Sequence, residues 1–426
     1  MKIDRRNFLT RSGAAALGAG AIGAGASAAD AAGKRGAGED PLQADGPLQL
    51  AVASDAAARL PAVPFHGPWQ AGIVNPPPPA GCFVSFNVTA TSRGALVDLL
   101  QTLTQRARFL TGGGAPANLG PVHPPSDSGT LGPDIPPDGL TVTVGLGSTL
   151  FDGRFGIASR KPIHLTEMTS FPNDNLNPDL CGGDLILQIC GGSSDTAIHA
   201  LRDIAKHTRG GMQINWRMDG FVAPPRPAGV PRNHFGFMDG IANPDMSDPV
   251  VANRLMWVQP GSGEPAWASG GTYHVCRLIR QLIEFWDRVS LNEQQTMIGR
   301  YRAGGSVLGT SSLTALPDFA ADPKGKIIPL AAHIRLANPR TKETEDSRIL
   351  RRGYNYDNGV DLAGNLDMGL IFNCFQQNLV RQFVANQTRL IGEPMVDYIS
   401  PVGGGYFFAV PGVADSSDWY ARALFD

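Results

Sequence analysis

Residues 82–113 read CFVSFNVTATSRGALVDLLQTLTQRARFLTGG, and they contain the clearest signals of secondary structure in the chain. The apolar run at 82–88 predicts a strand, and 91–113 has helical periodicity with a Thr/Ser start and a Gly stop. Working outward, the same reasoning predicts a strand, a second strand, a helix and a third strand at 140–147, 184–191, 193–210 and 212–221. The order β-α-β-β-α-β is the split arrangement of a ferredoxin-like unit.

The second half of the chain repeats this theme less regularly. Its pattern predicts strand, helix, strand, helix and strand at 273–282, 284–301, 366–378, 379–391 and 403–412. We therefore predict an α+β fold in which two ferredoxin-like domains, 63–223 and 224–426, form a dimeric α+β barrel-like arrangement. The boundary falls in the Pro- and Gly-rich segment 224–232. The loops at 112–139 and 148–183 are long enough to cover a ligand.

The first 28 residues predict an export signal. A basic start is followed by a Gly/Ala-rich run and by ASA at 26–28, a small-residue cleavage site. The adjacent Arg5 and Arg6 resemble the twin-arginine signal. A membrane anchor is disfavoured because the run is short and interrupted by glycines. We predict a signal at 1–28, a disordered leader at 29–62, and a periplasmic or secreted protein.

Composition narrows the classes of partner. The formal net charge of -2 gives no sign of nucleic-acid binding, and 42% hydrophobic with 17% charged residues describes a soluble globular chain. The five cysteines form no C-x-x-C pair, so we interpret them as buried apolar residues rather than as a zinc site or a disulfide framework. Small molecules are the expected partners.

Three short segments carry candidate chemistry, and none is decisive alone. GFMDG holds Asp239, for which the alternative is an aspartate that accepts backbone hydrogen bonds in a turn. AAHIRLANPR holds His333, which could be a satisfied core histidine. RILRRGYNY holds Arg351 and Arg352, and an arginine pair is more often a solvated face or a carboxylate clamp than a catalytic group.

Together these segments resemble the dye-decolorizing peroxidases, whose mark is G-x-x-D-G followed downstream by a haem-ligating histidine and a distal arginine. The resemblance runs from about Val63 to Phe425 and includes LFDGRFG at 150–156, CGGDLILQ at 181–188 and YISPVGGGYFFAVPG at 398–412. The wording of the motifs is most similar to the branch of the periplasmic deferrochelatase/peroxidases of ferrous-iron uptake.

The resemblance implies haem b, one per subunit, with His333 as iron ligand. Asp239 would move protons of the peroxide, and Arg351 would stabilise the charge that develops as its O–O bond breaks. Asp397 is our candidate for a carboxylate behind His333, with a turn or capping aspartate as the alternative. Arg340 is the candidate partner of a haem propionate. The implied haem contacts besides His333 are Gly240, Ile241, Ala242, Asn338, Pro339, Arg340 and Arg351.

The implied activity is a peroxidase that reduces hydrogen peroxide and oxidises organic donors such as dyes. Donors too large for a buried pocket would need a relay, for which the candidates are Trp257, Trp286, Tyr354 and Tyr356, with plain core packing as the alternative. The other implied activity is a deferrochelatase that releases iron from haem, leaves the porphyrin intact and works with an iron-uptake permease. The motifs do not separate the two. A haem carrier is disfavoured because it needs neither Asp239 nor Arg351. The family also implies a homo-oligomer.

Overall fold

The computed structural model describes residues 59–227 and 229–426. The predicted signal at 1–28 lies outside the described residues, and so does the predicted leader at 29–62 except for its last four residues. Within the described residues, no helix combines the length and apolar character that a membrane crossing requires.

Strand β1 (Ala80–Val88) and helix α1 (Arg93–Gly112) confirm the reading of the opening stretch. The Ser92 side chain accepts a hydrogen bond from the backbone N–H of Ala95 and caps the start of α1. Gly113 ends the helix with a φ of 72°, in the left-handed region that glycine adopts without steric cost. Capping and periodicity thus agree, which is why this element is readable from sequence.

Nine strands and seven α-helices are found in the described residues. The other strands are β2 (Thr141–Gly147), β3 (Leu185–Gly191), β4 (Met212–Phe221), β5 (Thr272–Gln281), β6 (Leu350–Arg351), β7 (Tyr354–Val360), β8 (Leu366–Gln376) and β9 (Ile399–Ala409). The other α-helices are α2 (Ser194–His207), α3 (Pro249–Leu255), α4 (Ile283–Trp286), α5 (Leu291–Ile298), α6 (His333–Ala337) and α7 (Ala385–Arg389), the last preceded by a π-helical turn at Val380–Val384. Short 3-10 turns lie at Ser148–Phe151, Ala158–Arg160, Pro178–Leu180, Ala266–Ala268, Glu345–Ser347, Pro394–Tyr398 and Arg422–Leu424.

The strands form one antiparallel sheet in the order β5-β9-β2-β3-β1-β4-β7-β8-β6, and an additional β5–β8 pairing closes eight of them into a barrel. The two halves of the chain meet at two seams. One joins β2 to β9, with Leu146 opposite Phe408, and the other joins β4 to β7 through the single pair Phe221 and Asn355. The predicted α+β barrel-like fold is confirmed, whereas the domain boundary at 224–232 stays a prediction.

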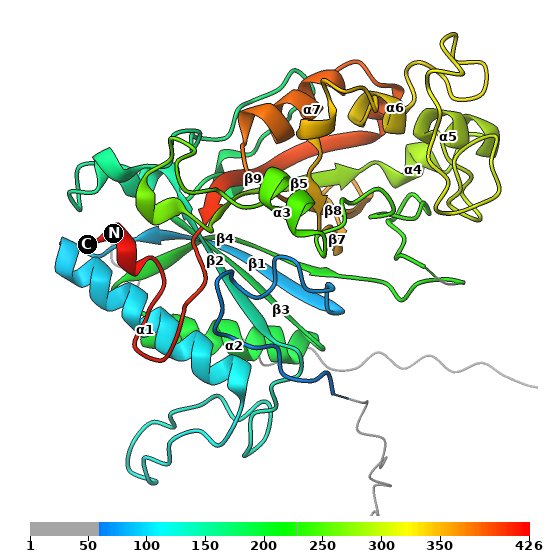
Figure 1. Cartoon of the computed structure of the whole chain (residues 1–426). Helices are drawn as coiled ribbons and strands as arrows, with labels where there is room; N and C mark the ends of the chain where they lie inside the picture. Colours follow the sequence, from blue (N-terminus) through cyan, green and yellow to red (C-terminus); the bar gives the residue numbers. More distant parts are fainter. Residues whose placement is uncertain (1–58, 228) are drawn as a thin grey trace, which may run out of the picture. The chain divides into compact units, whose positions relative to one another are not determined.

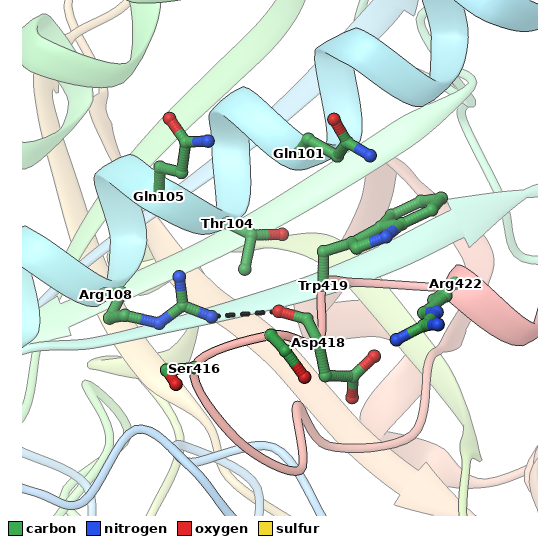
Figure 2. A pocket seen from close by; sticks show the side chains of 9 residues that line it. Gln101, Thr104, Gln105, Arg108, Ser416, Asp418, Trp419 and Arg422 are labelled. Carbon is green, nitrogen blue, oxygen red and sulfur yellow. Dashed lines mark hydrogen bonds between the residues drawn. The ribbon is translucent and has the colours of Figure 1, made fainter.

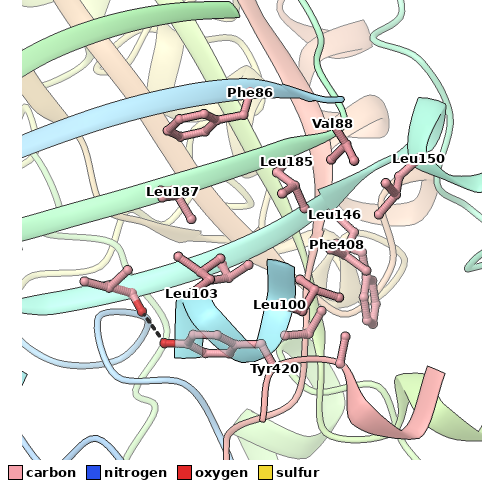
Figure 3. Packing of buried hydrophobic residues seen from close by; sticks show 14 of the residues in the cluster. Phe86, Val88, Leu100, Leu103, Leu146, Leu150, Leu185, Leu187, Phe408 and Tyr420 are labelled. Carbon is pink, nitrogen blue, oxygen red and sulfur yellow. Dashed lines mark hydrogen bonds between the residues drawn. The ribbon is translucent and has the colours of Figure 1, made fainter. Parts of the chain in front are cut away.

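Helices cover the barrel on opposite sides, with α1 and α2 against the first half and α6 and α7 against the second (Figure 1). Figure 3 shows the larger core, in which Leu100 and Leu103 of α1 face Leu187 of β3. Each fully buried leucine contributes about 1.5–3 kcal/mol. Tyr420 adds a hydrogen bond from its hydroxyl to the carbonyl of Val142, 2.9 Å away, so the C-terminal segment is fastened to β2.

The second half departs from the sequence prediction in local detail. The single helix predicted at 284–301 is wrong, because Ser290 caps a new helix and splits the segment into α4 and α5. Helices α3 and α6 and strands β6 and β7 were not predicted from the sequence. These elements are short, and α6 has no capping side chain at Ala332, so their local signals are weak.

Candidate functional site

A cavity of about 240 Å³ lies between the second half of the barrel and helices α6 and α7. Along β5, Cys276 and Leu278 pack in the barrel interior, whereas the alternate residues Arg277 and Ile279 line the cavity. This alternation is the two-residue period of a strand. The cavity therefore uses the outer face of the barrel as its floor.

Asp239 and Arg351 meet on one side of this cavity. Nη1 of Arg351 donates to Oδ1 of Asp239 over 2.8 Å, and both side chains line the cavity and are about a quarter exposed. Gly236 and Gly240 take φ values of 82° and 94°, so the two glycines of G-x-x-D-G provide the turn that presents the aspartate. The Asp239 carboxylate is paired with a cation, and not with the backbone of a turn as in the alternative reading.

Asn243 fixes the loop of Asp239 to the strand of Arg351. Its amide nitrogen donates to the carbonyl of Arg351 over 2.8 Å, and the backbone N–H of Arg351 donates back to its Oδ1 over 3.0 Å. Asn243 is itself three residues beyond Gly240, whose carbonyl accepts from its backbone N–H. The Asn243 side chain thus takes the place of a neighbouring strand for the backbone of Arg351. This role of Asn243 was not predicted from the sequence.

We expect Asn243→Ala to lower kcat/KM for peroxide roughly tenfold, the effect of losing two hydrogen bonds that position Arg351. Haem affinity should not change, because Asn243 does not line the cavity. Asn243→Asp keeps the acceptor for the Arg351 N–H, so its kcat/KM should lie between that of the unmodified protein and that of Asn243→Ala. The exposed Asn87→Ala is the control. Equal kcat/KM for Asn243→Ala and the unmodified protein would remove this positioning role.

On the other side of the cavity, His333 begins helix α6 and hydrogen-bonds a buried carboxylate. Nδ1 of His333 lies 2.6 Å from Oε2 of Glu393, which is 3% exposed. Burial by itself would lower the pKa of His333, but the charge and hydrogen bond of Glu393 outweigh it and raise the pKa. Because Nδ1 is occupied by Glu393, Nε2 is the nitrogen available to a ligand in the cavity.

The prediction that Asp397 supports His333 is wrong. The supporting carboxylate is Glu393, four residues earlier, whereas Asp397 is exposed in the 3-10 turn at Pro394–Tyr398. Glu393 is the residue before this turn, and its side chain is buried. In the sequence, Glu393 and Asp397 both follow the predicted helix at 379–391 and lie four residues apart. Their roles could not be told apart without coordinates.

We expect Glu393→Gln to lower haem affinity roughly 10- to 100-fold, since a carboxylate behind a metal-binding histidine typically contributes that much. Asp397→Asn is the matched control and should leave haem affinity within about twofold. A haem titration followed by Soret absorbance measures both variants. The reverse ranking would restore Asp397 to the role that the sequence suggested.

Arginines give the cavity a positive rim. Arg300, Arg340, Arg348 and Arg351 all line it. Burial, and then the charges of Arg351 and Arg340, lower the pKa of Arg300 to about 10. Among the residues that the structure describes, Arg300 and Arg340 form no ion pair with a carboxylate, in contrast to Arg348 and Arg351. Two unpaired cations suit a ligand with two carboxylates. From the sequence, Arg340 was predicted as a partner of a haem propionate, and Arg300 was not.

The remaining predicted haem contacts divide into two groups. Ile241, Ala242 and Asn338 line the cavity, and Oδ1 of Asn338 is buried without a hydrogen-bond partner in the described part of the chain. Gly240 and Pro339 do not line it. They act through the backbone instead, since Gly240 forms the turn after Asp239 and Pro339 precedes Arg340, whose φ of 58° is rare outside glycine.

The four aromatic residues proposed as relays are all buried, with exposures of 1–2%. Trp257 is stacked on Trp69, with ring centroids 4.8 Å apart and planes within 8°. Trp69 is 42% exposed, so this pair reaches from the core to the surface. Core packing accounts for the burial of the other three, Trp286, Tyr354 and Tyr356.

A second hollow, of about 480 Å³, lies between α1 and the C-terminal segment 416–422 (Figure 2). Polar side chains of Gln101 and Gln105 line it, and Arg108 crosses it to donate to the carbonyl of Asp418 over 2.9 Å. None of the residues predicted for the site lines this hollow. The first cavity is therefore the candidate site.

Comparisons with known proteins agree with the resemblance inferred from the motifs. Residues 70–222 match the model "Dyp-type peroxidase, N-terminal" and residues 230–414 match "Dyp-type peroxidase, C-terminal". Two similar curated proteins are named deferrochelatase. The one from Yersinia pestis is 48% identical over 85% of both chains, and the one from Escherichia coli K12 is 49% identical over 85% of this chain and 86% of that protein.

Solved structures extend the comparison to the fold. A DyP-type peroxidase from Streptomyces coelicolor has a TM-score of 0.78 and 30% identity, covering 86% of this chain and 98% of the other. One from Cellulomonas bogoriensis has a TM-score of 0.76 and 33% identity with the same coverage.

Proposed function

Because this chain belongs to the Dyp-type peroxidase family, we propose that it is a haem-dependent peroxidase that reduces hydrogen peroxide and oxidises small organic donors. The observation that carries the proposal is the meeting of two hydrogen-bonded pairs in one cavity, Asp239 with Arg351 and His333 with Glu393. The first pair has the groups to move a proton and stabilise an anion, and the second has the groups to hold a metal.

We propose haem b, one per subunit, as the cofactor, and the side chains around the cavity support a haem at this place. His333 would hold the iron through Nε2, with Glu393 keeping its ring in a fixed orientation. Arg300 and Arg340, which lack carboxylate partners in the described chain, would bind the two propionates. When bound, haem supplies a redox-active iron, which reduces peroxide and then oxidises the donors.

Asp239 and Arg351 would then act on different atoms of the peroxide. Oδ1 of Asp239 accepts from Arg351, which leaves Oδ2 to take a proton from the peroxide and return it to the departing oxygen. The guanidinium of Arg351 stabilises the negative charge that develops on that oxygen. Asn243 holds Arg351 in place for this step.

The test is peroxide-dependent oxidation of guaiacol by haem-loaded protein, compared with free haem at the same concentration. The proposal predicts saturable turnover well above that of free haem. Turnover no greater than free haem, from protein that retains haem through gel filtration, would overturn the peroxidase assignment while leaving the haem site intact.

Release of iron from haem with the porphyrin left intact is a second candidate, favoured by the name deferrochelatase borne by relatives at 48–49% identity. The same cavity and His333 would hold the haem substrate. The two functions differ in product. Haem-loaded protein, incubated with a reductant and a ferrous chelator and no peroxide, should yield metal-free porphyrin fluorescence and chelated iron in equal amounts only if this second function operates.

We also propose periplasmic or secreted location through twin-arginine export, on the basis of Arg5 and Arg6 in the N-terminal segment. Cell fractionation of the chain with both arginines changed to lysine should find it retained in the cytoplasm. Export of that variant at the normal level would point to another route. The homo-oligomer and the iron-permease partner stay predictions.

A further inference from the structure

The segment that carries Arg351 has a second face, which points into the barrel. Arg351 lines the cavity, and a Cβ added at Gly353 would lie 3.5 Å from Asp239, so these two positions face the site. Strand alternation turns Arg352 and Tyr354 the other way. Tyr354 packs in the interior cluster, edge-on to Phe83 of β1.

Arg352 is a buried cation without a counter-charge. It is 4% exposed, and Nη1 donates to the backbone carbonyl of Asn75. Its Nε and Nη2 are buried with no hydrogen-bond partner apart from the neutral Cys190 thiol beside them, and no carboxylate in the described chain pairs with it within 4.0 Å, unlike its neighbour Arg351. Burying an unpaired charge costs several kcal/mol, so buried charges in proteins are normally compensated.

Other unsatisfied polar groups converge on the same end of the barrel. The hydroxyls of Tyr354 and Thr141 are buried, and in the residues described they have no partner besides the neutral Cys190 thiol next to Tyr354. Thr141 lies opposite Cys190, which in turn lies opposite Gly81, and the Tyr354 ring would be 2.8 Å from a Cβ at Gly81. These contacts bring Tyr354, Thr141 and Cys190 to adjacent positions on the inner wall.

The turn at 72–75 connects Thr141 to Arg352. A Cβ on Gly72 would lie 2.8 Å from Oγ1 of Thr141, and the carbonyl of Asn75 accepts from Arg352. The turn is held by a hydrogen bond of 2.9 Å from the Gly72 N–H to the Asn75 side chain. It therefore closes the barrel over a group of residues whose free polar atoms can all donate.

The side chains themselves do not supply the missing negative charge. Burial raises the pKa of the Cys190 thiol, and burial raises the pKa of Tyr354 well above its ordinary value. Both groups are therefore neutral donors. A guanidinium is a donor only, and hydroxyl and thiol groups can orient their hydrogens toward a common acceptor.

We propose that a small inorganic anion of the size of chloride binds inside the barrel, between the free N–H groups of Arg352 and the hydroxyls of Tyr354 and Thr141. The anion neutralises Arg352 and satisfies donors that are otherwise unpaired. It is separate from the candidate haem site, because Arg352, Tyr354 and Thr141 do not line that cavity. The proposal is independent of the proposed function.

The first experiment is diffraction from crystals of the exported form of the chain, grown in bromide, with anomalous data collected at the bromine edge. An anomalous peak within hydrogen-bond distance of Nε or Nη2 of Arg352 and of the Tyr354 and Thr141 hydroxyls is the expected result. Density at that place with no anomalous signal would mean ordered water only, and would overturn the proposal.

The second experiment measures thermal unfolding in gluconate after exhaustive dialysis, with bromide added at constant ionic strength. The unmodified protein should gain stability along a saturating curve. Thr141→Val, which keeps the side-chain shape, should need roughly tenfold more bromide, as expected for losing one hydrogen bond to a charged group. Arg352→Met should lose the dependence, whereas Arg202→Met, on the exposed face of α2, should keep it. If unmodified protein gives the same unfolding temperature in bromide and gluconate, the anion site does not exist.

Discussion

Replacing His333 with alanine is expected to weaken haem binding by more than about 100-fold. Loss of a group behind a metal ligand already costs roughly 10- to 100-fold, and loss of the ligand removes the bond itself. The variant also leaves the buried carboxylate of Glu393 without its hydrogen-bond partner, 2.6 Å away in the unmodified protein. Soret titration of the haem-free protein measures the affinity.

The exposed His123→Ala variant is the control for this measurement, since His123 lies in the long loop at 112–139 and does not line the cavity. Added imidazole should restore a Soret band to His333→Ala, because the truncation leaves space for a free ligand beside Glu393. Unchanged haem affinity in His333→Ala would show that another side chain holds the iron, and the cavity would have to be reassigned.

Replacing Asp239 with asparagine is expected to slow peroxide-dependent turnover by about 10²- to 10⁴-fold, the usual contribution of a positioned proton-transfer group. Asparagine has the same shape and keeps an oxygen that can accept from Arg351, so the 2.8 Å contact can persist. Only the ability to take a proton is lost. Haem affinity should be unchanged, because the residue that would hold iron is on the opposite side of the cavity.

Stopped-flow measurement of the reaction with peroxide, together with steady-state guaiacol oxidation, tests this expectation. Asp245→Asn, at an exposed position six residues along the same loop, is the matched control and should react at the unmodified rate. If Asp239→Asn reacts at the unmodified rate as well, Arg351 alone carries the distal chemistry, and Arg351→Met should then show the larger loss.

The paired contacts are the reason that we expect different effects from the two variants. Asp239 and Arg351 are 112 residues apart in the chain, and His333 and Glu393 are 60 apart, yet each pair is joined by a direct hydrogen bond. The pairs come from different elements, with Arg351 on β6 and His333 on α6. The proposed haem binding and the proposed peroxide chemistry would therefore depend on different parts of the fold.

The sequence by itself determined the elements with strong local signals. The strand at β1 and the helix at α1 were readable because alternation, periodicity, the Ser92 cap and the Gly113 stop all agree within one short stretch. The three residues proposed for catalysis and iron binding were named by motif, because each motif is local and the structure only had to bring them together. The prediction of one helix at 284–301 was wrong at Ser290, because the apolar pattern continues across a weak break.

Only the tertiary structure decided the partners of those residues. Closure of the barrel brings Glu393, and not Asp397, to His333. It also brings Asn243 to the backbone of Arg351 and places Arg300 at the cavity. A linear pattern does not encode these contacts. The buried Arg352 is a second example of a feature that the linear pattern does not predict. Its sequence neighbour Arg351 faces the site, and one step of strand alternation places Arg352 inside the barrel, where its charge is unpaired in the described chain because no acidic side chain folds back to meet it.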